Sequence, residues 1–330
     1  MNGLQQCWYR LSPLHLLLIP VSLVFGVLAA MRRALYRWGI LAAERLPVPV
    51  IVIGNITVGG SGKTPLTLWL AQQLAQRGWH PGIVSRGYGG AVRSPRAVVR
   101  TSSTQEMGDE AVLMARRGLC PVWVGRDRPV VARALLQAHP ECDVILSDDG
   151  LQHYRLNRDV EIVVVDGIRR FGNGMLLPAG PLREPRSRLD KVDAVVINGG
   201  VTAADEFSMA LDGDVFYNLA SPGDTARPAD FAGKNLHAIA GIGHPQRFFD
   251  HLRKLGLDVT THPFPDHYAY APRDLEFAGA DAILMTEKDA VKCEPFASKK
   301  CWVLSVEARL DPALVQRVLQ RISPDGRQAS

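Results

Sequence analysis

Short apolar runs alternate with amphipathic segments along most of the chain. Residues 49–55 (PVIVIGN) form a continuous apolar run, and apolar residues then recur at helical spacing through residues 64–78, where Gly78 ends the pattern. The same patterns predict further strands at 81–87, 96–101, 121–127, 142–148, 160–167 and 193–199, with helices at 109–118 and 128–140. Alternation of this kind indicates an α/β fold in which helices flank a mainly parallel sheet.

The pattern is interrupted in the middle of the chain and then resumes. A stretch rich in Pro, Gly and Arg (173–190) and a loosely patterned region up to about residue 230 separate the two parts. Later strands are predicted at 235–243, 258–267, 281–289 and 301–307. We therefore expect an N-terminal segment at 1–45, a main α/β domain at 46–230 and a smaller C-terminal α/β domain at 231–330.

An apolar segment near the N-terminus, residues 14–30, is followed by Arg32, Arg33, Arg37 and Arg45. A helix of this length measures about 25 Å, which is marginal for a hydrocarbon core of roughly 30 Å. The arginines lie after the apolar run, opposite to the order in a signal peptide, and the positive-inside rule places them in the cytoplasm. The segment is predicted to be a membrane-associated helix, either spanning or interfacial, and the alternative is a buried core helix.

Composition and charge exclude several classes of protein but do not choose a ligand. With 47% hydrophobic and 22% charged residues, the 330-residue chain has the composition of a folded protein. Its five cysteines are scattered and form no C-x-x-C pair, which argues against a disulfide framework or a zinc site. A net charge of +5 suits nucleic acid, an anionic membrane or a phosphorylated substrate. The arginines are dispersed and not interleaved with aromatic residues, which argues against nucleic acid.

The most specific motif lies between the first predicted strand and the first predicted helix. Residues 54–64 read GNITVGGSGKT, close to the phosphate-binding pattern G-x-x-x-x-G-K-[ST], with Thr57 in place of the first Gly. In such a loop the backbone N–H groups bind phosphates, Lys63 reaches the β- and γ-phosphates, and Thr64 ligates Mg²⁺. The predicted ATP contacts are Thr57, Val58, Gly59, Gly60, Ser61, Gly62, Lys63 and Thr64. The alternative is a glycine-rich turn without a ligand.

Two adjacent carboxylates, Asp148 and Asp149, lie at the end of another predicted strand. Ligands of a parallel sheet gather at the carboxyl ends of its strands, so we expect Asp148 to lie opposite Thr64 and to hold Mg²⁺. Two such carboxylates would suit the start of a helix equally well. The upstream phosphate loop favours the metal site.

Seven motifs, in this order and at this spacing, resemble those of one enzyme family. GNITVGGSGKTP, SRGYGG, MGDEA, SDDGLQH, LLPAGPLREP, FPDHYAY and MTEKDAVK closely resemble the tetraacyldisaccharide 4'-kinases, the lipid A 4'-kinases of Gram-negative bacteria, over residues 14–320. The resemblance implies transfer of the ATP γ-phosphate to the 4'-hydroxyl of tetraacyldisaccharide 1-phosphate, giving lipid IVA at the cytoplasmic face of the inner membrane. It also implies a P-loop domain, a smaller C-terminal domain and an N-terminal membrane helix.

The resemblance assigns roles in phosphate transfer to Lys63 of the loop and to residues outside the loop. Asp109 in MGDEA would be the base that accepts the proton of the sugar hydroxyl, while Lys63 acts on the transferred phosphate. His267 in FPDHYAY would be the partner of Asp109 from the second domain, so that closure of the domains assembles the site. The further residues that it implies are Glu110 and Glu184 around the metal, and Arg86, Tyr88 and Arg183 against phosphates.

Each of these residues also has a purely structural interpretation. Asp109 and Glu110 would suit the first turn of a helix, which favours negative charge. His267 would suit a turn. The segment 286–292 follows a predicted strand, and its simplest structural role is mutual ion pairing among Glu287, Lys288 and Asp289.

Two other functions fit part of the sequence. VGGSGKT also resembles the loop of switch ATPases that cycle on membranes, but those proteins carry a Lys before the double Gly, where this chain has Val58. A kinase with a soluble acceptor is the nearest enzymatic rival, and the apolar N-terminus argues against it. We therefore predict a kinase that uses ATP and Mg²⁺ and acts on an acylated disaccharide phospholipid at the inner membrane. It would need no nucleic acid and no obligate protein partner.

Overall fold

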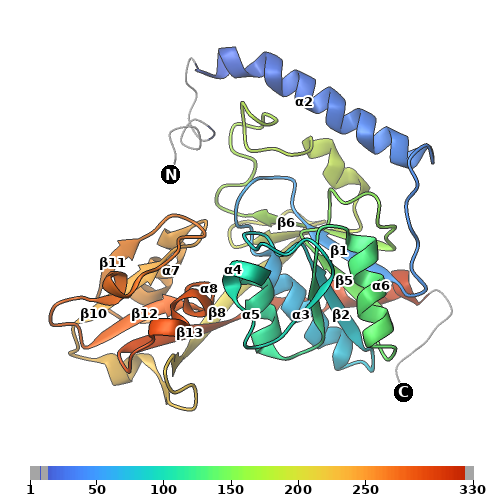
Figure 1. The fold of residues 1–330 in the computed structure, drawn as a ribbon. Coiled ribbons are helices and arrows are strands. Elements are labelled where there is room, and N and C mark those ends of the chain that lie inside the picture. The colour runs from blue at the N-terminus through green and yellow to red at the C-terminus, as the bar shows by residue number, and fades with distance from the viewer. Residues whose placement is uncertain (1–7, 9–13, 324–330) are drawn as a thin grey trace.

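One mixed sheet runs through the whole molecule. The structure, a computed structural model, describes Trp8 and residues 14–323 (Figure 1). Within these residues the strand order is β11-β10-β12-β13-β8-β7-β6-β1-β5-β2-β4-β3, and β9 pairs with β8. The strands are β1 (Val50–Gly54), β2 (Pro81–Ser85), β3 (Arg96–Val98), β4 (Val122–Val124), β5 (Val144–Asp148), β6 (Val160–Asp166), β7 (Ala194–Asn198), β8 (Phe207–Asn218), β9 (Thr225–Ala226), β10 (Leu236–Ala240), β11 (Val259–Pro263), β12 (Ala282–Thr286) and β13 (Cys301–Leu310).

Helices cover both faces of this sheet. The α-helices are α2 (Leu14–Arg37), α3 (Lys63–Ala75), α4 (Thr104–Met107), α5 (Asp109–Arg117), α6 (Arg128–Ala138), α7 (Pro245–Lys254), α8 (Glu287–Cys293) and α9 (Ala313–Ile322). The short 3₁₀ helices are η1 (Arg186–Lys191), η2 (Pro228–Phe231), η3 (Pro272–Leu275) and η4 (Glu294–Phe296).

The sheet forms two lobes, joined by β8 and β13 (Figure 1). We call strands β1–β7 with α3–α6 and α9 the P-loop lobe, and strands β9–β12 with α7 and α8 the C-terminal lobe. Successive residues of a strand point to opposite faces, and Ile51 and Val52 accordingly belong to different apolar cores of the P-loop lobe. The C-terminal lobe has two further cores of its own. The predicted α/β class is confirmed, while the domain boundary at residue 230 stays a prediction.

The strands that carry the motifs end at one edge of the sheet. β1 lies between β5 and β6 and is parallel to both, with Ile53 paired to Asp148 and Gly54 to Val163. This register brings the loop that follows β1 and the carboxylate that ends β5 to the same edge. The sheet therefore positions both halves of the predicted nucleotide site.

Three strands of the C-terminal lobe end earlier than predicted, and β10, predicted over 235–243, ends at Ala240. The strand predicted over 258–267 ends at Pro263, so that Phe264–His267 form a loop instead. The strand predicted over 281–289 ends at Thr286, and α8 begins at the next residue. The Thr286 side chain accepts a hydrogen bond from the Asp289 N–H, which caps the new helix and stops the strand.

Several elements were not predicted, among them α7, β8 and α9. The 12-residue strand β8 contains Asp212, Gly213 and Asp214, which break the apolar alternation, and its pairing with β13 shifts register between Ser305 and Glu307. Helix α9 returns from the end of β13 to the P-loop lobe and buries one apolar face in its core. The final residues of the described chain therefore support the first lobe.

Helix α2 is longer than the apolar segment predicted at 14–30 and ends at Arg37. It is the one helix of the described part of the chain that is long and apolar enough to cross a membrane, by length and composition. Figure 1 shows it beside the P-loop lobe, apart from the sheet. Ser22 attaches it there: its hydroxyl donates to the Leu176 carbonyl at 3.0 Å and accepts from the Ala179 N–H at 2.9 Å. Most of the remaining apolar surface of α2 is exposed.

Four cysteines of the described residues, Cys120, Cys142, Cys293 and Cys301, are free thiols. Cys7 lies outside the described residues. Residues 1–7 and 9–13 of the predicted N-terminal segment, and residues 324–330 of the predicted C-terminal domain, also lie outside the described residues.

Candidate functional site

The phosphate loop is held in shape by two asparagines. The Asn55 amide, directly after β1, donates to the Gly59 carbonyl at 3.2 Å and to the Ser61 hydroxyl at 3.3 Å. The Asn198 amide, at the end of β7, donates to the Ser61 carbonyl at 3.0 Å. Gly62 has φ +96°, and a Cβ there would lie 2.3 Å from the Asn198 amide nitrogen, so only glycine fits. The loop is therefore shaped in advance of ligand binding.

Helix α3 begins inside the motif, at Lys63, so that Lys63 and Thr64 form its first turn. The first N–H groups of a helix have no intrahelical partner, and the helix dipole is positive there, which suits a phosphate. The C-terminal lobe approaches the same loop: a Cβ on Gly243 would lie 2.9 Å from the Gly60 nitrogen. The loop thus lies where the two lobes meet.

Asp148 is fully buried at the end of β5 and has one carboxylate oxygen without a partner. The Thr67 hydroxyl donates to Oδ1 at 3.3 Å, whereas Oδ2 contacts no donor. Burial, followed by the charge of Glu110, raises the pKa of Asp148 to about 7. An unpartnered carboxylate oxygen beside a phosphate loop fits a divalent cation, which would supply the missing positive charge.

Asp149 has the opposite electrostatic environment. Its Oδ1 lies 3.5 Å from Lys63 Nζ and 3.5 Å from Arg183 Nη1. Burial raises the pKa of Asp149, but the charges of Lys63 and Arg183 outweigh burial and hold it below the ordinary value. Its backbone is left-handed, with φ +48°, an uncommon conformation for a residue other than glycine. The strained turn places this charged carboxylate beside the lysine of the loop.

The structure brings Asp109 and His267 together from different lobes. Asp109 is the first residue of α5, and its Oδ2 lies 3.2 Å from Nδ1 of His267 in the loop after β11. Burial raises the pKa of Asp109, yet the His267 hydrogen bond and the charges of Lys292 and Lys288 lower it overall. His267 has φ +59°, again a conformation that side chains other than glycine seldom adopt. Asp109 is therefore a charged carboxylate with one oxygen held by the histidine.

Tyr88 and Arg86 lie on the exposed loop after β2. The Tyr88 ring is 5.1 Å from the His267 ring, centroid to centroid, and 61% of the tyrosine side chain is exposed. Arg86 is also exposed, and its charge helps to lower the pKa values of Arg128 and His153. Tyr88 therefore lies beside the Asp109–His267 pair, and both side chains are exposed.

Glu110, a predicted metal ligand, forms an ion pair with the C-terminal lobe. Its Oε1 lies 3.2 Å from Lys288 Nζ, which also lies 3.2 Å from Asp266 Oδ1. Neighbouring residues of α8 have other partners, since Glu287 pairs with Arg117 at 2.7 Å. The structural interpretation in which Glu287, Lys288 and Asp289 pair with one another is therefore wrong. Glu287 and Lys288 both pair with α5, whereas the buried Asp289 accepts hydrogen bonds from the Gly241 N–H and the Tyr270 hydroxyl.

Glu184, also a predicted metal ligand, is directed away from the Asp148–Asp149 pair. Its carboxylate accepts hydrogen bonds from Gln152 at 2.8 Å and from Tyr154 at 2.7 Å. It also pairs with Arg188 at 3.3 Å and with Arg33 of α2 at 3.5 Å. Its role at the metal stays a prediction, and its observed role is to link α2 to the P-loop lobe.

Sequence reasoning missed Arg128, the largest fully buried side chain of the described residues. Its guanidinium donates to the Asp148 carbonyl at 2.8 Å and to the Gly125 carbonyl at 3.2 Å. Burial lowers its pKa to about 10, so it remains charged at neutral pH. No periodic signal marks a buried arginine. Only its position at the start of a predicted helix, near a ligand-binding edge, could have drawn attention to it.

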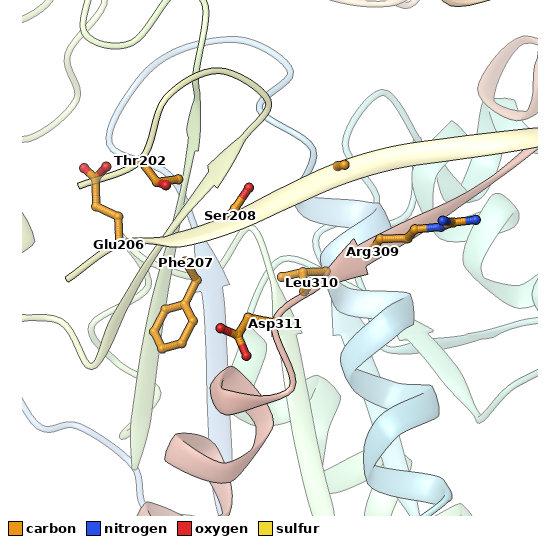
Figure 2. A pocket seen from close by; sticks show the side chains of 8 residues that line it. Thr202, Glu206, Phe207, Ser208, Arg309, Leu310 and Asp311 are labelled. Atoms are coloured by element: carbon orange, nitrogen blue, oxygen red, sulfur yellow. The ribbon is translucent and has the colours of Figure 1, made fainter. Parts of the chain in front are cut away.

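Two of the surface hollows of the described residues lie beside α2 and at the junction of the lobes. One of about 280 Å³ lies between α2 and residues 176–185, is mostly apolar, and includes Arg183 and Glu184 in its lining. The other, of about 410 Å³, lies where β8 begins and β13 ends, and contains no predicted site residue. Figure 2 shows Glu206 and Arg309 at its opposite ends. The first hollow adjoins the phosphate site through Arg183, and the second is a shallow depression at the junction of the lobes.

Known proteins resemble the chain over nearly its full length. The family model for tetraacyldisaccharide-1-P 4'-kinase (LpxK) matches residues 14–323. A tetraacyldisaccharide 4'-kinase from Azoarcus sp. (strain BH72) is 54% identical over 321 residues, which cover 96% of this chain and 94% of the relative. Its counterpart from Methylobacillus flagellatus is 52% identical over 320 residues, covering 97% and 96%.

A solved structure agrees with the sequence comparisons. A crystal structure of LpxK from Aquifex aeolicus in complex with ATP superposes with a TM-score of 0.79 at 29% identity, covering 94% of this chain and 99% of that one. These findings confirm the predicted fold class, the kinase class and the use of ATP, with Mg²⁺ as the usual partner of ATP in such kinases. The chain belongs to the tetraacyldisaccharide-1-P 4'-kinase family.

Proposed function

We propose that this protein transfers the γ-phosphate of ATP to the 4'-hydroxyl of tetraacyldisaccharide 1-phosphate, giving lipid IVA for lipid A biosynthesis. The observation that carries the proposal is the pairing of Asp109 with His267 across the two lobes, at a distance of 3.2 Å. A sugar hydroxyl is a poor nucleophile at neutral pH and benefits from a carboxylate that accepts its proton. The low pKa of Asp109 keeps this carboxylate ionised and ready to accept a proton.

The phosphate loop binds the phosphates of ATP, and the carboxylates bind the metal ion and the proton. Lys63 binds and neutralises the β- and γ-phosphates, and the amides of the loop orient them for in-line transfer. Thr64, Asp148 and Asp149 would hold Mg²⁺, which supplies charge neutralisation between the phosphates. Asp109 takes the hydroxyl proton through the oxygen that His267 leaves free. The transfer needs no covalent enzyme intermediate.

We further propose that α2 keeps the enzyme on the cytoplasmic face of the inner membrane. Leu17, Leu23 and Val27 are exposed by 75%, 66% and 66%, which is costly in water. Four acyl chains hold the substrate in the bilayer, because each buried CH₂ is worth about 0.8 kcal/mol. The apolar hollow beside α2 adjoins Arg183, so a lipid seated there would present its head group toward the phosphate site. Arg32 and Arg37 are exposed and would meet anionic lipid head groups.

The activity is tested by transfer of ³²P from γ-labelled ATP, with Mg²⁺, to detergent-dispersed tetraacyldisaccharide 1-phosphate. A deacylated disaccharide 1-phosphate serves as the matched acceptor. We expect label on the acylated lipid, and label at the 4'-position identifies the acceptor hydroxyl. Equal labelling of both acceptors would indicate a kinase of soluble sugars. ATP hydrolysis without label on either acceptor would support the switch ATPase instead.

The membrane proposal has its own test, which leaves the nucleotide site intact. Leu17→Glu with Val24→Glu places two charges on the exposed face of α2, and Leu17→Val with Val24→Leu is the matched control. We expect the charged variant to lose flotation with vesicles that contain anionic phospholipid, while its affinity for ATP is unchanged. Equal flotation of both variants would contradict the proposed role of α2.

A further inference from the structure

Lys288 of α8 reaches out of the C-terminal lobe into the Asp109–His267 pair. Its Nζ lies 3.2 Å from Glu110 Oε1, 3.2 Å from Asp266 Oδ1 and 3.5 Å from His267 Nε2. Only 16% of the lysine side chain is exposed. The side chain therefore ends at a site where three acceptors converge on one ammonium group.

The number of donors matches the number of acceptors. A lysine ammonium has three N–H donors and no acceptor. Two of its partners are carboxylates, and the third is the Nε2 atom of His267. Burial opposes the charge of Lys288, but Glu110 and Asp266 outweigh it and raise the pKa of the lysine, so it stays an ammonium. An ammonium has only donors, so a ring nitrogen hydrogen-bonded to it is the acceptor; in this contact Nε2 of His267, which also lies 3.9 Å from Asp266 Oδ1, carries no proton.

A neutral imidazole carries its one proton on the other ring nitrogen. In His267 that nitrogen is Nδ1, which lies 3.2 Å from Asp109 Oδ2. In this tautomer Nδ1–H donates to the carboxylate. In the other tautomer a nitrogen lone pair would face the charged oxygen and repel it.

We propose that Lys288 is a positioning residue, which fixes the Nδ1–H tautomer of His267 and thereby holds the Asp109 carboxylate in place for the acceptor hydroxyl. The inference rests on the proposed function, in which Asp109 accepts the proton. Lys288 acts through the histidine.

The backbone around Lys288 is rigid enough for this role. Thr286 caps the helix that carries it, and the side chain before it, Glu287, pairs with Arg117 of α5 at 2.7 Å. Arg116 of α5 in turn pairs with Glu294. Helices α5 and α8 are therefore linked by two ion pairs, and a third joins α5 to the residue that follows α8. Of these contacts only that of Lys288 reaches the histidine.

Steady-state kinetics of three variants test the inference. Lys288→Met removes all three donors, and Lys288→Gln keeps a polar group whose amide oxygen can accept, so the tautomer is no longer dictated. Glu294→Gln breaks a different ion pair, between α5 and the residue directly after α8, and is the matched control. We expect kcat to fall by about 10–100-fold in both lysine variants, with KM for ATP within about twofold of the parent and the control near the parent. If kcat fell equally in the control, the Lys288 contact would matter only for holding the lobes together, and the inference would be overturned.

A double-mutant comparison separates this inference from the proposed function. If Lys288 acts through the pair, Lys288→Met should lower kcat little further once Asp109→Asn has removed the base. If the fold-loss of kcat in the double variant equalled the product of the losses in the two single variants, Lys288 would not act through Asp109. A normal kcat for Asp109→Asn alone would instead overturn the base role of Asp109, which is the proposed function itself.

Nuclear magnetic resonance gives a readout that does not depend on turnover. In protein labelled with ¹⁵N only in its histidine rings, His267→Gln identifies the His267 signals among those of nine histidines. We expect the parent to show protonated Nδ1 and unprotonated Nε2, and Lys288→Met to show the Nε2–H tautomer or a mixture. The same Nδ1–H pattern in the parent and in Lys288→Met would overturn the inference.

Discussion

The phosphate loop and the Asp109–His267 pair lie at the same site but are built in opposite ways. The loop is contiguous in sequence, and its shape comes from asparagines at the ends of β1 and β7, which lie on either side of β6 in one lobe. The pair joins residues 158 positions apart, one from each lobe. The loop can therefore bind nucleotide whatever the position of the C-terminal lobe, whereas the pair exists only when the lobes are close.

This difference separates nucleotide binding from phosphate transfer. Substitutions in the loop should weaken both, because they remove the cations and amides that hold ATP. Substitutions around the pair should lower kcat and leave the affinity for ATP unchanged. The comparison would be wrong if substitutions in the loop lowered only kcat, or if substitutions around the pair weakened the binding of ATP.

The largest effect is expected for Lys63→Ala. Lys63 is the cation of the loop, and a cation at the transferred phosphoryl group is worth about 10³–10⁵-fold in rate. We expect transfer to fall by at least that factor and ATP to bind more weakly, as measured by γ-phosphate transfer and by titration with a fluorescent nucleotide. Retention of full transfer would mean that another residue supplies this charge.

Asp109→Asn should follow, with a fall in kcat of about 10²–10⁴-fold, the usual contribution of a general base. The affinity for ATP should stay at the parental value, measured by the same titration. Asp214→Asn, which removes an exposed ion pair with Arg227, is the control for the substitution itself. A kcat within a few-fold of the parent would exclude Asp109 as the base.

Asp148 should couple stability to pH and to Mg²⁺. Its pKa of about 7 in the folded protein lies above the 3.8 of an unperturbed aspartate, so between these two pH values the folded state holds a proton that the unfolded chain releases. Its contribution to stability is present below about pH 4 and is lost as pH rises through about 7. Mg²⁺ should therefore raise Tm by several degrees at pH 8 and by less at pH 6.

Asp148→Asn is the control for this coupling, since it removes the titrating group and keeps the shape. We expect the variant to lose the extra stabilisation by Mg²⁺ at the higher pH, as measured by thermal unfolding. If Mg²⁺ stabilised the parent and the variant equally, the metal would be bound by residues other than Asp148.

The smallest effect is expected at Tyr88, whose ring contacts His267 of the Asp109–His267 pair. An aromatic contact is worth about 0.5–1.5 kcal/mol, or roughly twofold to tenfold in rate if it is needed to hold His267. Tyr88→Ala should lower kcat by that factor, whereas Tyr88→Phe keeps the ring and should stay near the parent. Equal losses in both variants would show that the hydroxyl, and not the ring contact, matters.

The accuracy of the sequence predictions follows the same division. The loop and the Asp148–Asp149 pair could be located because each is a short motif next to a strand, and a parallel sheet brings strand ends together. The ion pair of Glu110 with Lys288 could not be predicted, because it depends on how α5 and α8 face each other. Strand β8 was missed because its charged residues and its glycine interrupt the alternation on which strand prediction depends.

Sequence alone determined most strands of the P-loop lobe, the phosphate loop, the apolar N-terminal helix and, through seven motifs, the family. Those features depend on neighbouring residues, whose spacing is written in the chain. Only the tertiary structure decided the partners of Glu184 and Lys288, one beside α2 and the other beside His267. The physical reason is that a long charged side chain has several oppositely charged partners within reach, and the packing of distant helices and loops selects among them.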